Sequence, residues 1–265
     1  TKEKGRGQDI LYPSGAYRNG ALGRLGDQKK TSINEAIGRP AHFSAFCYPW
    51  DAKRQVGLFR GRPNTHTLSR YVLPRMVNES TLDQPTARLL DIGLVWYMAK
   101  HDPLVNANRS LPPLARAETK NFEEHLQQKY LVSLDGHSYA NRLIKLLATD
   151  SLVVKEETLA LEFYYHMLKP FVHYLPFNFS ARGPIMRSRV PLYHHFDVRT
   201  NLVEAIEYAK AHDSQMQAIA QRAQRLVHTH LCYAARRCYW RRLIERYAHK
   251  LTYRPSLLNR TGALL

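Results

Sequence analysis

The sequence predicts an α/β fold built on a parallel β-sheet, and three observations lead to this prediction. Residues 130–134 form an apolar run of strand length. An amphipathic segment follows, in which Leu143, Leu146 and Leu147 recur at helical spacing. A second apolar run then covers residues 151–154. Strand, loop, helix and strand in this order make the unit from which parallel sheets are built.

The region before this unit is expected to add one strand and several helical segments. Residues 1–50 are rich in glycine, proline and polar side chains and show little periodicity, so we expect an irregular N-terminal arm. A short strand is predicted at residues 56–59. The other expected segments are helical or mixed structure at 68–77 and 87–100, a loop at 111–113 and a short polar helix at 118–128.

The region after the unit is expected to be a long loop followed by helices. Proline, glycine and paired histidines are typical of a loop over residues 177–197. Helical spacing predicts two helices at 202–211 and 214–230, and a longer one at 233–251.

Composition excludes several classes of protein. The 265 residues are 44% hydrophobic and 23% charged, which is ordinary for a globular protein with a substantial core. No apolar run approaches the length that a membrane-spanning helix needs. Three cysteines, Cys47, Cys232 and Cys238, exclude a disulfide-rich framework. The first residues carry no signal-peptide core, so we expect either a removed targeting segment or a longer polypeptide.

The net charge of +17 is large for this length and indicates an acidic partner of one of four classes: nucleotide, RNA, anionic lipid or acidic protein. Between residues 221 and 254 the chain has one acidic residue, Glu245, against nine basic ones. These are Arg222, Arg225, Arg236, Arg237, Arg241, Arg242, Arg246, Lys250 and Arg254. Arg182, Arg187 and Arg189 form a second cluster. The charge is either a solvated helix face or a docking surface for an acidic partner.

The loop after the first strand of the βαβ unit is the best candidate for a ligand site. In such units the loop and the N-terminus of the following helix bind a phosphate through free backbone N–H groups. Gly136 lies in this loop, and Arg142 stands where a guanidinium can close on the phosphate. The alternative is that Gly136 serves only the turn and Arg142 is a surface charge.

Several motifs occur in an order that resembles a known family, the Rumi-type protein O-glucosyltransferases and their capsule-associated relatives of glycosyltransferase family 90. The motifs in the unit itself are Lys129-Tyr130-Leu131, the loop 136–142, Ser151-Leu152-Val153, Glu162-Phe163-Tyr164 and the stretch LKPFVHYLP at 168–176. The motifs outside it are residues 9–13, Tyr48-Pro49-Trp50, Leu58-Phe59-Arg60-Gly61, Cys238-Tyr239-Trp240 and residues 243–247.

The resemblance implies a GT-B glycosyltransferase, an arrangement of two Rossmann-like domains in which the C-terminal one holds most of the sugar nucleotide. This chain resembles the C-terminal half. The predicted domains are the arm at 1–50, a Rossmann-like donor-binding domain at 51–215, and basic C-terminal helices and tail at 216–265.

The resemblance also implies a binding site for a UDP-sugar donor; no other cofactor and no metal site are predicted. The expected donor-binding residues are Phe59, Arg60, Gly61, Arg70, Gly136, His137, Ser138, Tyr139, Ala140, Asn141 and Arg142. Glu162 is added from its placement after the second strand, where a carboxylate can accept hydrogen bonds from ribose hydroxyls.

The chain departs from the family pattern in two places that concern catalysis. Arg62-Pro63-Asn64 stands where the family has a serine after Phe-Arg-Gly. The Arg-Asp-Tyr-Pro element that carries the family's catalytic aspartate does not occur in this sequence. No catalytic residue is therefore predicted in these 265 residues.

Two functions follow. The first is a non-catalytic accessory subunit of a large protein or ribonucleoprotein assembly, bound through the Arg-rich helix 233–251 and the loop 181–199; low cysteine content and basic charge would suit a mitochondrial location. The alternative is an active inverting O-glycosyltransferase that moves glucose or xylose from a UDP-sugar to a protein or glycan hydroxyl, in the ER or Golgi lumen by resemblance. The missing aspartate and the surplus charge favour the first.

Overall fold

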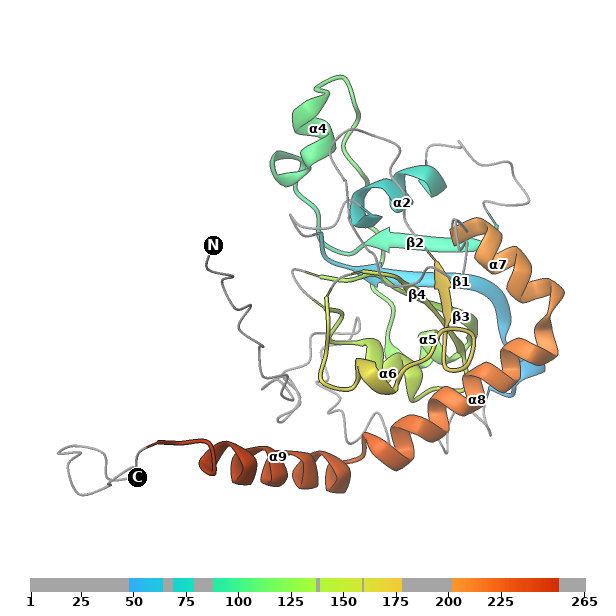
Figure 1. Cartoon of the computed structure of the whole chain (residues 1–265). Helices are drawn as coiled ribbons and strands as arrows, with labels where there is room; N and C mark the ends of the chain where they lie inside the picture. Colours follow the sequence, from blue (N-terminus) through green and yellow to red (C-terminus); the bar gives the residue numbers. More distant parts are fainter. Residues whose placement is uncertain are drawn as a thin grey trace, which may run out of the picture.

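The computed structural model describes residues 48–63, 69–78, 88–136, 139–158, 160–177 and 202–252. Within them five strands form one sheet in the order β2-β1-β3-β4-β5, and every neighbouring pair is parallel (Figure 1). The strands are β1 (Arg54–Gly61), β2 (Leu90–Leu94), β3 (Gln128–Ser133), β4 (Leu152–Glu156) and β5 (Leu175–Phe177). This is a Rossmann-like α/β fold, as the sequence predicts.

The central strands are apolar on both faces because both faces are covered. Side chains alternate along β3: Tyr130 and Val132 belong to one hydrophobic cluster, whereas Leu131 belongs to the other. The first cluster also contains residues of α2 (Ser69–Asn78) and α7 (Leu202–Ala211). The second contains the apolar residues of α6 (Leu143–Leu147).

Helix α8 (Asp213–His230) connects the two faces. Its first half contributes Met216 and Ile219 to the cluster with α2 and α7, and its second half contributes Leu226 and Val227 to the cluster with α6. The helix spans residue 215, where the predicted domain boundary lies, and it packs on the core along its length.

Five of the other helices that the structure describes are short. They are η2 (Trp50–Ala52), η3 (Ala99–His101), α4 (Pro103–Ala107), α5 (Phe122–Leu126) and η4 (Tyr165–Met167). Helix α5 begins at a capping box in which Asn121 and Glu124 exchange side-chain and backbone hydrogen bonds. The expected helix over 118–128 is therefore shorter than predicted, because Gln128 already belongs to β3.

Strand β2 lies in a segment, 87–100, that the sequence suggested to be helical or mixed. Leu90, Ile92 and Leu94 are buried and pair with β1 in parallel register. Gly93 lets the chain segment at Ala117 pass close by, since a Cβ on Gly93 would lie 2.3 Å from the Ala117 Cβ. Strand β5 was not predicted either; its three residues are fixed by pairing with β4.

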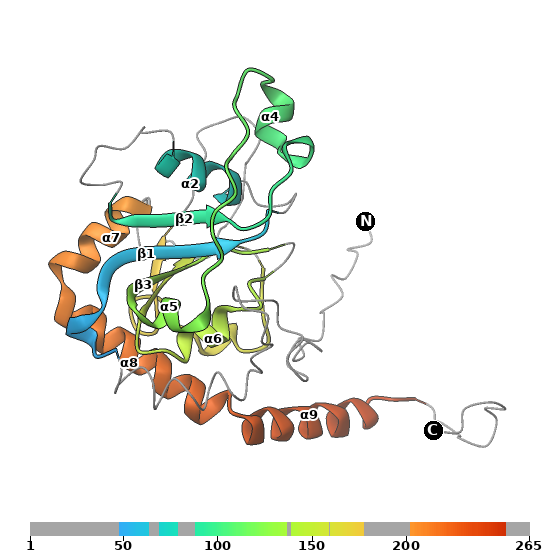
Figure 2. The ribbon, with the colours of Figure 1, turned by 180° about the vertical axis from the view of Figure 1, so that it is seen from behind.

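Helix α9 (Tyr233–Ala248) continues from α8 and runs away from the sheet (Figure 2). Near its start, the ring of Tyr239 packs 5.1 Å from that of Phe163. Trp240 and Tyr247 of this helix are 36% and 54% exposed. The predicted Arg-rich helix does not expose all of its arginines, because Arg236 is only 5% exposed. Side chains three or four residues apart lie on the same face of a helix, so Arg236 and Tyr239 both lie on the face of α9 that packs against the domain.

None of the helices that the structure describes combines the length and apolar character needed to cross a bilayer. The loop 181–199 and most of the arm 1–50 lie outside the described residues.

Candidate functional site

The carboxyl ends of β1 and β3 bring the predicted donor-binding residues together. Phe59 and Gly61 lie at the end of β1, and Gly136 follows β3. The two strands are neighbours in the sheet, with Leu58 paired to Leu131. Because parallel strands end at the same edge, their loops form one surface, which is where ligands bind in open α/β sheets.

Arg70, the second residue of α2, holds these two loops against each other. Its guanidinium donates to the carbonyl oxygens of Asp135 at 2.6 Å, Leu134 at 2.8 Å and Arg62 at 2.7 Å. The side chain is 7% exposed. Arg70 therefore connects the segment after β1 with the segment after β3.

Arg142 lies at the far end of the loop that follows β3, and its guanidinium also reaches the end of β1. It is the N-cap residue of α6, and its Nη1 donates to the carbonyl oxygen of Arg60. The guanidinium carbon lies 4.7 Å from the centre of the Phe59 ring, and that of Arg70 lies 5.5 Å from the same ring. The prediction that Arg142 stands at the start of the helix after Gly136 is confirmed.

Burial and mutual repulsion act on the two arginines. Burial, and then the charge of Arg70, lower the pKa of Arg142 to about 9. Burial lowers the pKa of Arg70 to about 10, although Glu156 and Asp135 oppose this. Both groups stay charged at neutral pH. No described carboxylate is among the groups that act on the pKa of Arg142, whereas Asp135 and Glu156 partly offset the charge of Arg70.

His125 of α5 adds no charge to the site. It is 2% exposed, and its Nδ1 lies 2.7 Å from the carbonyl oxygen of Asn121. Burial lowers its pKa to about 4, and the charges of Arg142 and Arg60 act in the same direction. The ring is neutral at physiological pH.

Gly61 is required for the close approach of Phe59 and Arg142. A Cβ at this position would lie 2.5 Å from the Phe59 Cζ and 2.8 Å from Arg142 Nη2. At Gly136 an added Cβ would meet its nearest neighbours at 3.6 Å and 3.7 Å, which is ordinary contact. The two glycines of the predicted site thus differ in how strictly the fold needs them.

Other predicted residues take different positions. The Arg60 guanidinium turns toward β2, where it pairs with Asp91 at 2.6 Å and donates to the Glu118 carbonyl oxygen at 2.8 Å. Only its backbone carbonyl reaches Arg142. Glu162 is 2% exposed and lies in the segment between β4 and η4.

The rest of the predicted loop is described only in part. Ala140 is buried, Tyr139 is partly buried and Asn141 is exposed. His137 and Ser138 lie outside the described residues.

Three residues at this edge were not singled out from the sequence. Ser69, Asp135 and Glu156 are all buried, and the Ser69 hydroxyl donates to the Glu156 carboxyl at 3.0 Å. Thr158 donates to the Asp135 carboxyl. Asp135 and Glu156 each follow a predicted strand, and polar residues directly after parallel strands were the signal that could have found them.

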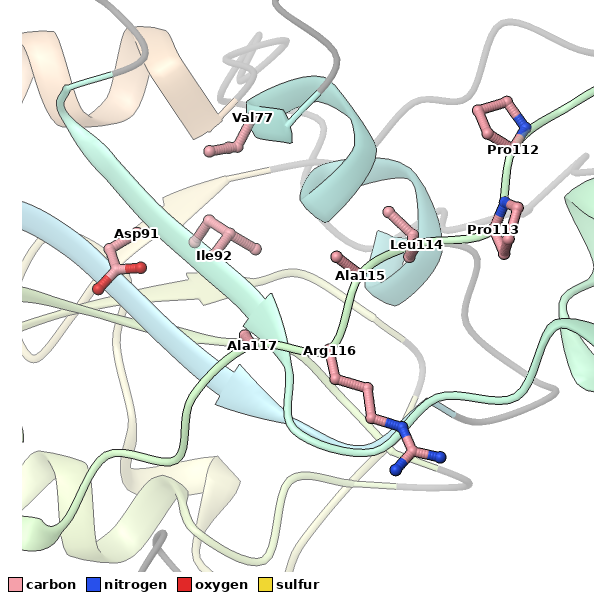
Figure 3. Close-up of a pocket in the computed structure, with 9 residues that line it drawn as sticks. All are labelled: Val77, Asp91, Ile92, Pro112, Pro113, Leu114, Ala115, Arg116 and Ala117. Carbon is pink, nitrogen blue, oxygen red and sulfur yellow. The ribbon is translucent and has the colours of Figure 1, made fainter.

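A separate hollow of about 390 Å³ lies beside β2, the outermost strand on one side of the sheet (Figure 3). It is bounded by Val77 of α2, Asp91 and Ile92 of β2, and the segment 112–117. None of the predicted donor-binding residues lines it, and most of its lining is apolar. It is therefore distinct from the arginine site.

Comparison with known proteins connects this site to one family. Residues 44–263 match Glycosyl transferase family 90. The chain is 29% identical over 209 residues to Protein O-glucosyltransferase 2 of Danio rerio, covering 78% of this chain and 35% of that protein. It is 28% identical over 246 residues to O-glucosyltransferase rumi of Drosophila melanogaster, covering 93% and 53%.

Human Protein O-glucosyltransferase 1 is 26% identical over 250 residues, covering 92% of this chain and 55% of that protein. The chain thus spans about half, or about a third, of the length of these relatives. The family match covers most of the chain and includes every strand that the structure describes. The chain belongs to glycosyl transferase family 90.

Proposed function

We propose that this domain binds the diphosphate of a UDP-sugar between Arg70 and Arg142 and takes part in transferring the sugar to a hydroxyl group. The observation that carries the proposal is the pair of guanidinium groups beside the Phe59 ring. Two cations held near each other by backbone contacts, one of them with no described acidic partner, favour a dianionic ligand.

The site supports the role of a donor pocket in a transfer reaction. In sugar transfer the UDP leaving group gains negative charge as the glycosidic bond breaks. Cations already held in position stabilise this charge without further rearrangement. Arg70 is fixed by three carbonyl oxygens and Arg142 by one, so both are preorganised.

The names of the relatives favour glucose as the transferred sugar, since those proteins are O-glucosyltransferases. The comparisons support the glycosyltransferase alternative better than the accessory-subunit hypothesis. No residue of this chain is assigned as the group that deprotonates the acceptor hydroxyl.

The experiment is calorimetric titration of the chain with UDP, together with thermal unfolding at saturating UDP. Arg142→Ala is expected to weaken binding by at least about tenfold, the equivalent of one charge-assisted hydrogen bond. The matched control is Arg242→Ala, which removes an exposed arginine of α9. UDP at 100 times its dissociation constant would stabilise the chain by about 2.7 kcal/mol. Absence of any shift at millimolar UDP would reject the proposal.

A further inference from the structure

A buried carboxyl group lies next to the proposed donor site without belonging to it. Glu156, the last residue of β4, is 6% exposed. Its Oε2 accepts a hydrogen bond from the Ser69 hydroxyl at 3.0 Å, and the carboxyl also hydrogen-bonds the backbone N–H of Asp135. Ser69 precedes Arg70 in α2, and Asp135 precedes Gly136. The carboxyl thus links the helix that carries Arg70 to the loop that carries Gly136.

The charges that act on the Glu156 carboxyl come from two elements. Arg70 of α2 attracts the carboxylate, and Asp135 after β3 repels it. Strand β5 presents Phe177 opposite Glu156 in the parallel register. On its own strand segment, Lys155 Nζ donates to the backbone carbonyl oxygen of Glu156 at 2.9 Å, pairs with Glu157 at 3.6 Å and lies 5.2 Å from the Tyr165 ring. It is not among the groups that act on the pKa of the Glu156 carboxyl.

Burial raises the pKa of Glu156 to about 7, while the Ser69 hydroxyl holds it lower than burial alone would. Repulsion from Asp135 adds to the increase, and attraction to Arg70 opposes it. The group therefore changes charge near neutral pH.

We propose that Glu156 is a positioning residue of the donor site, and that the charge on its carboxyl sets how strongly Arg70 attracts the diphosphate. The inference rests on the proposed function. A neutral carboxyl can keep both hydrogen bonds, because its carbonyl oxygen accepts from the Asp135 N–H and its O–H donates to the Ser69 hydroxyl. Ionisation keeps the geometry but places a negative charge beside Arg70, where it competes with the ligand.

Binding of an anionic donor should then be coupled to protonation of Glu156. A rise of one unit in the pKa of Glu156 on binding corresponds to a tenfold change in the dissociation constant across the titration. The dissociation constant for UDP is expected to increase as the pH rises through about 7. UDP has a titration of its own, which is the same for every variant and cancels when variants are compared.

The test is the dissociation constant for UDP between pH 5.5 and 8.5, measured by calorimetry for four proteins. Glu156→Gln mimics the neutral carboxyl, so its binding should lack the roughly tenfold loss at high pH that the original chain shows. Ser69→Ala removes the bond that lowers the pKa of Glu156, so the midpoint of the pH dependence should move upward. The matched control Glu157→Gln makes the same change one residue later and should keep the original profile.

The outcomes separate the inference from the function on which it rests. UDP binding by the original chain with an unchanged pH profile in Glu156→Gln would overturn the inference and leave the proposed function standing. If Glu156→Gln bound UDP more weakly by the same factor at every pH, Glu156 would have only a structural role and the inference would be rejected. Failure of the original chain to bind UDP at any pH would overturn both. If Glu156→Gln does not fold, the test is the pH midpoint of UDP binding by Ser69→Ala. A midpoint equal to that of the original chain would reject the inference.

Discussion

At the scale of single residues, the proposed donor site depends on how closely one aromatic ring and two guanidinium groups approach one another. Phe59 supplies the flat surface, Arg70 and Arg142 supply the charge, and Gly61 supplies the space. The arginines are held by backbone carbonyl oxygens rather than by acidic side chains. The positive charge of Arg142 is therefore left for a ligand, whereas Glu156 and Asp135 offset part of the charge of Arg70.

The two glycines of the site give a matched pair of substitutions. Gly61→Ala would place a methyl group 2.5 Å from the Phe59 Cζ and 2.8 Å from Arg142 Nη2, so the ring or the guanidinium must move. Overpacking of this kind costs about 1–3 kcal/mol, and the displaced arginine should weaken UDP binding by about tenfold or more. Thermal unfolding and calorimetry would measure the two effects.

Gly136→Ala is the control, because its added methyl group meets only ordinary contacts. We expect a change in stability below about 1 kcal/mol. Equal losses in both variants would contradict the distinction that the structure makes between the two glycines.

At the scale of elements, a buried ion pair holds α2 against the end of β2 and the start of α4. Asp102 is 0% exposed and accepts from Arg75 at 2.8 Å and from the Tyr97 hydroxyl at 2.8 Å. It is also the N-cap of α4, accepting from the Leu104 N–H at 2.9 Å. Since α2 carries Arg70, this pair also supports the helix that forms one side of the site.

Asp102→Ala should therefore destabilise the chain strongly. Removing one partner of a buried pair leaves the other charge uncompensated, which costs about 3–5 kcal/mol. Chemical denaturation would measure the loss. The control Asp51→Ala removes an exposed carboxylate from η2 and should change stability by less than about 0.5 kcal/mol. A loss below 1 kcal/mol for Asp102→Ala would contradict the role assigned to the pair.

At the scale of the whole molecule, the net charge of +17 sets up repulsion that the fold must overcome. Salt screens such repulsion, and the Debye length falls from about 30 Å at 0.01 M to about 8 Å at 0.15 M ionic strength. We expect the melting temperature to rise over this range of NaCl. UDP binding should weaken over the same range, because the arginine site attracts its ligand by charge.

The opposite signs of these two effects make the measurement informative. Sucrose is the control, since it stabilises folded proteins without screening charge. It should raise the melting temperature without the loss of UDP affinity that NaCl causes. A melting temperature that falls with NaCl would show that attractive ion pairs, rather than net repulsion, dominate the electrostatics of the chain.

Much of the fold follows from local pattern, and the exceptions have physical reasons. The βαβ unit was predictable because each of its parts has the right length and periodicity. Strand β2 was not, because five residues containing Gly93 gain strand geometry only by pairing with β1. In α9, periodicity predicted the helix but not which face packs, and the packed face is the one that carries Arg236 and Tyr239.

The sequence by itself determined the family and the parallel sheet, and it predicted the loops and arginines that the structure brings together, because these are encoded in short motifs in a fixed order. Only the tertiary structure decided the direction of each side chain. It turned the Arg60 guanidinium toward Asp91, buried Glu162, and placed Glu156 between Ser69 and Asp135. The physical reason is that side-chain direction at the end of a strand depends on the neighbouring strands and helices, which come from distant parts of the chain.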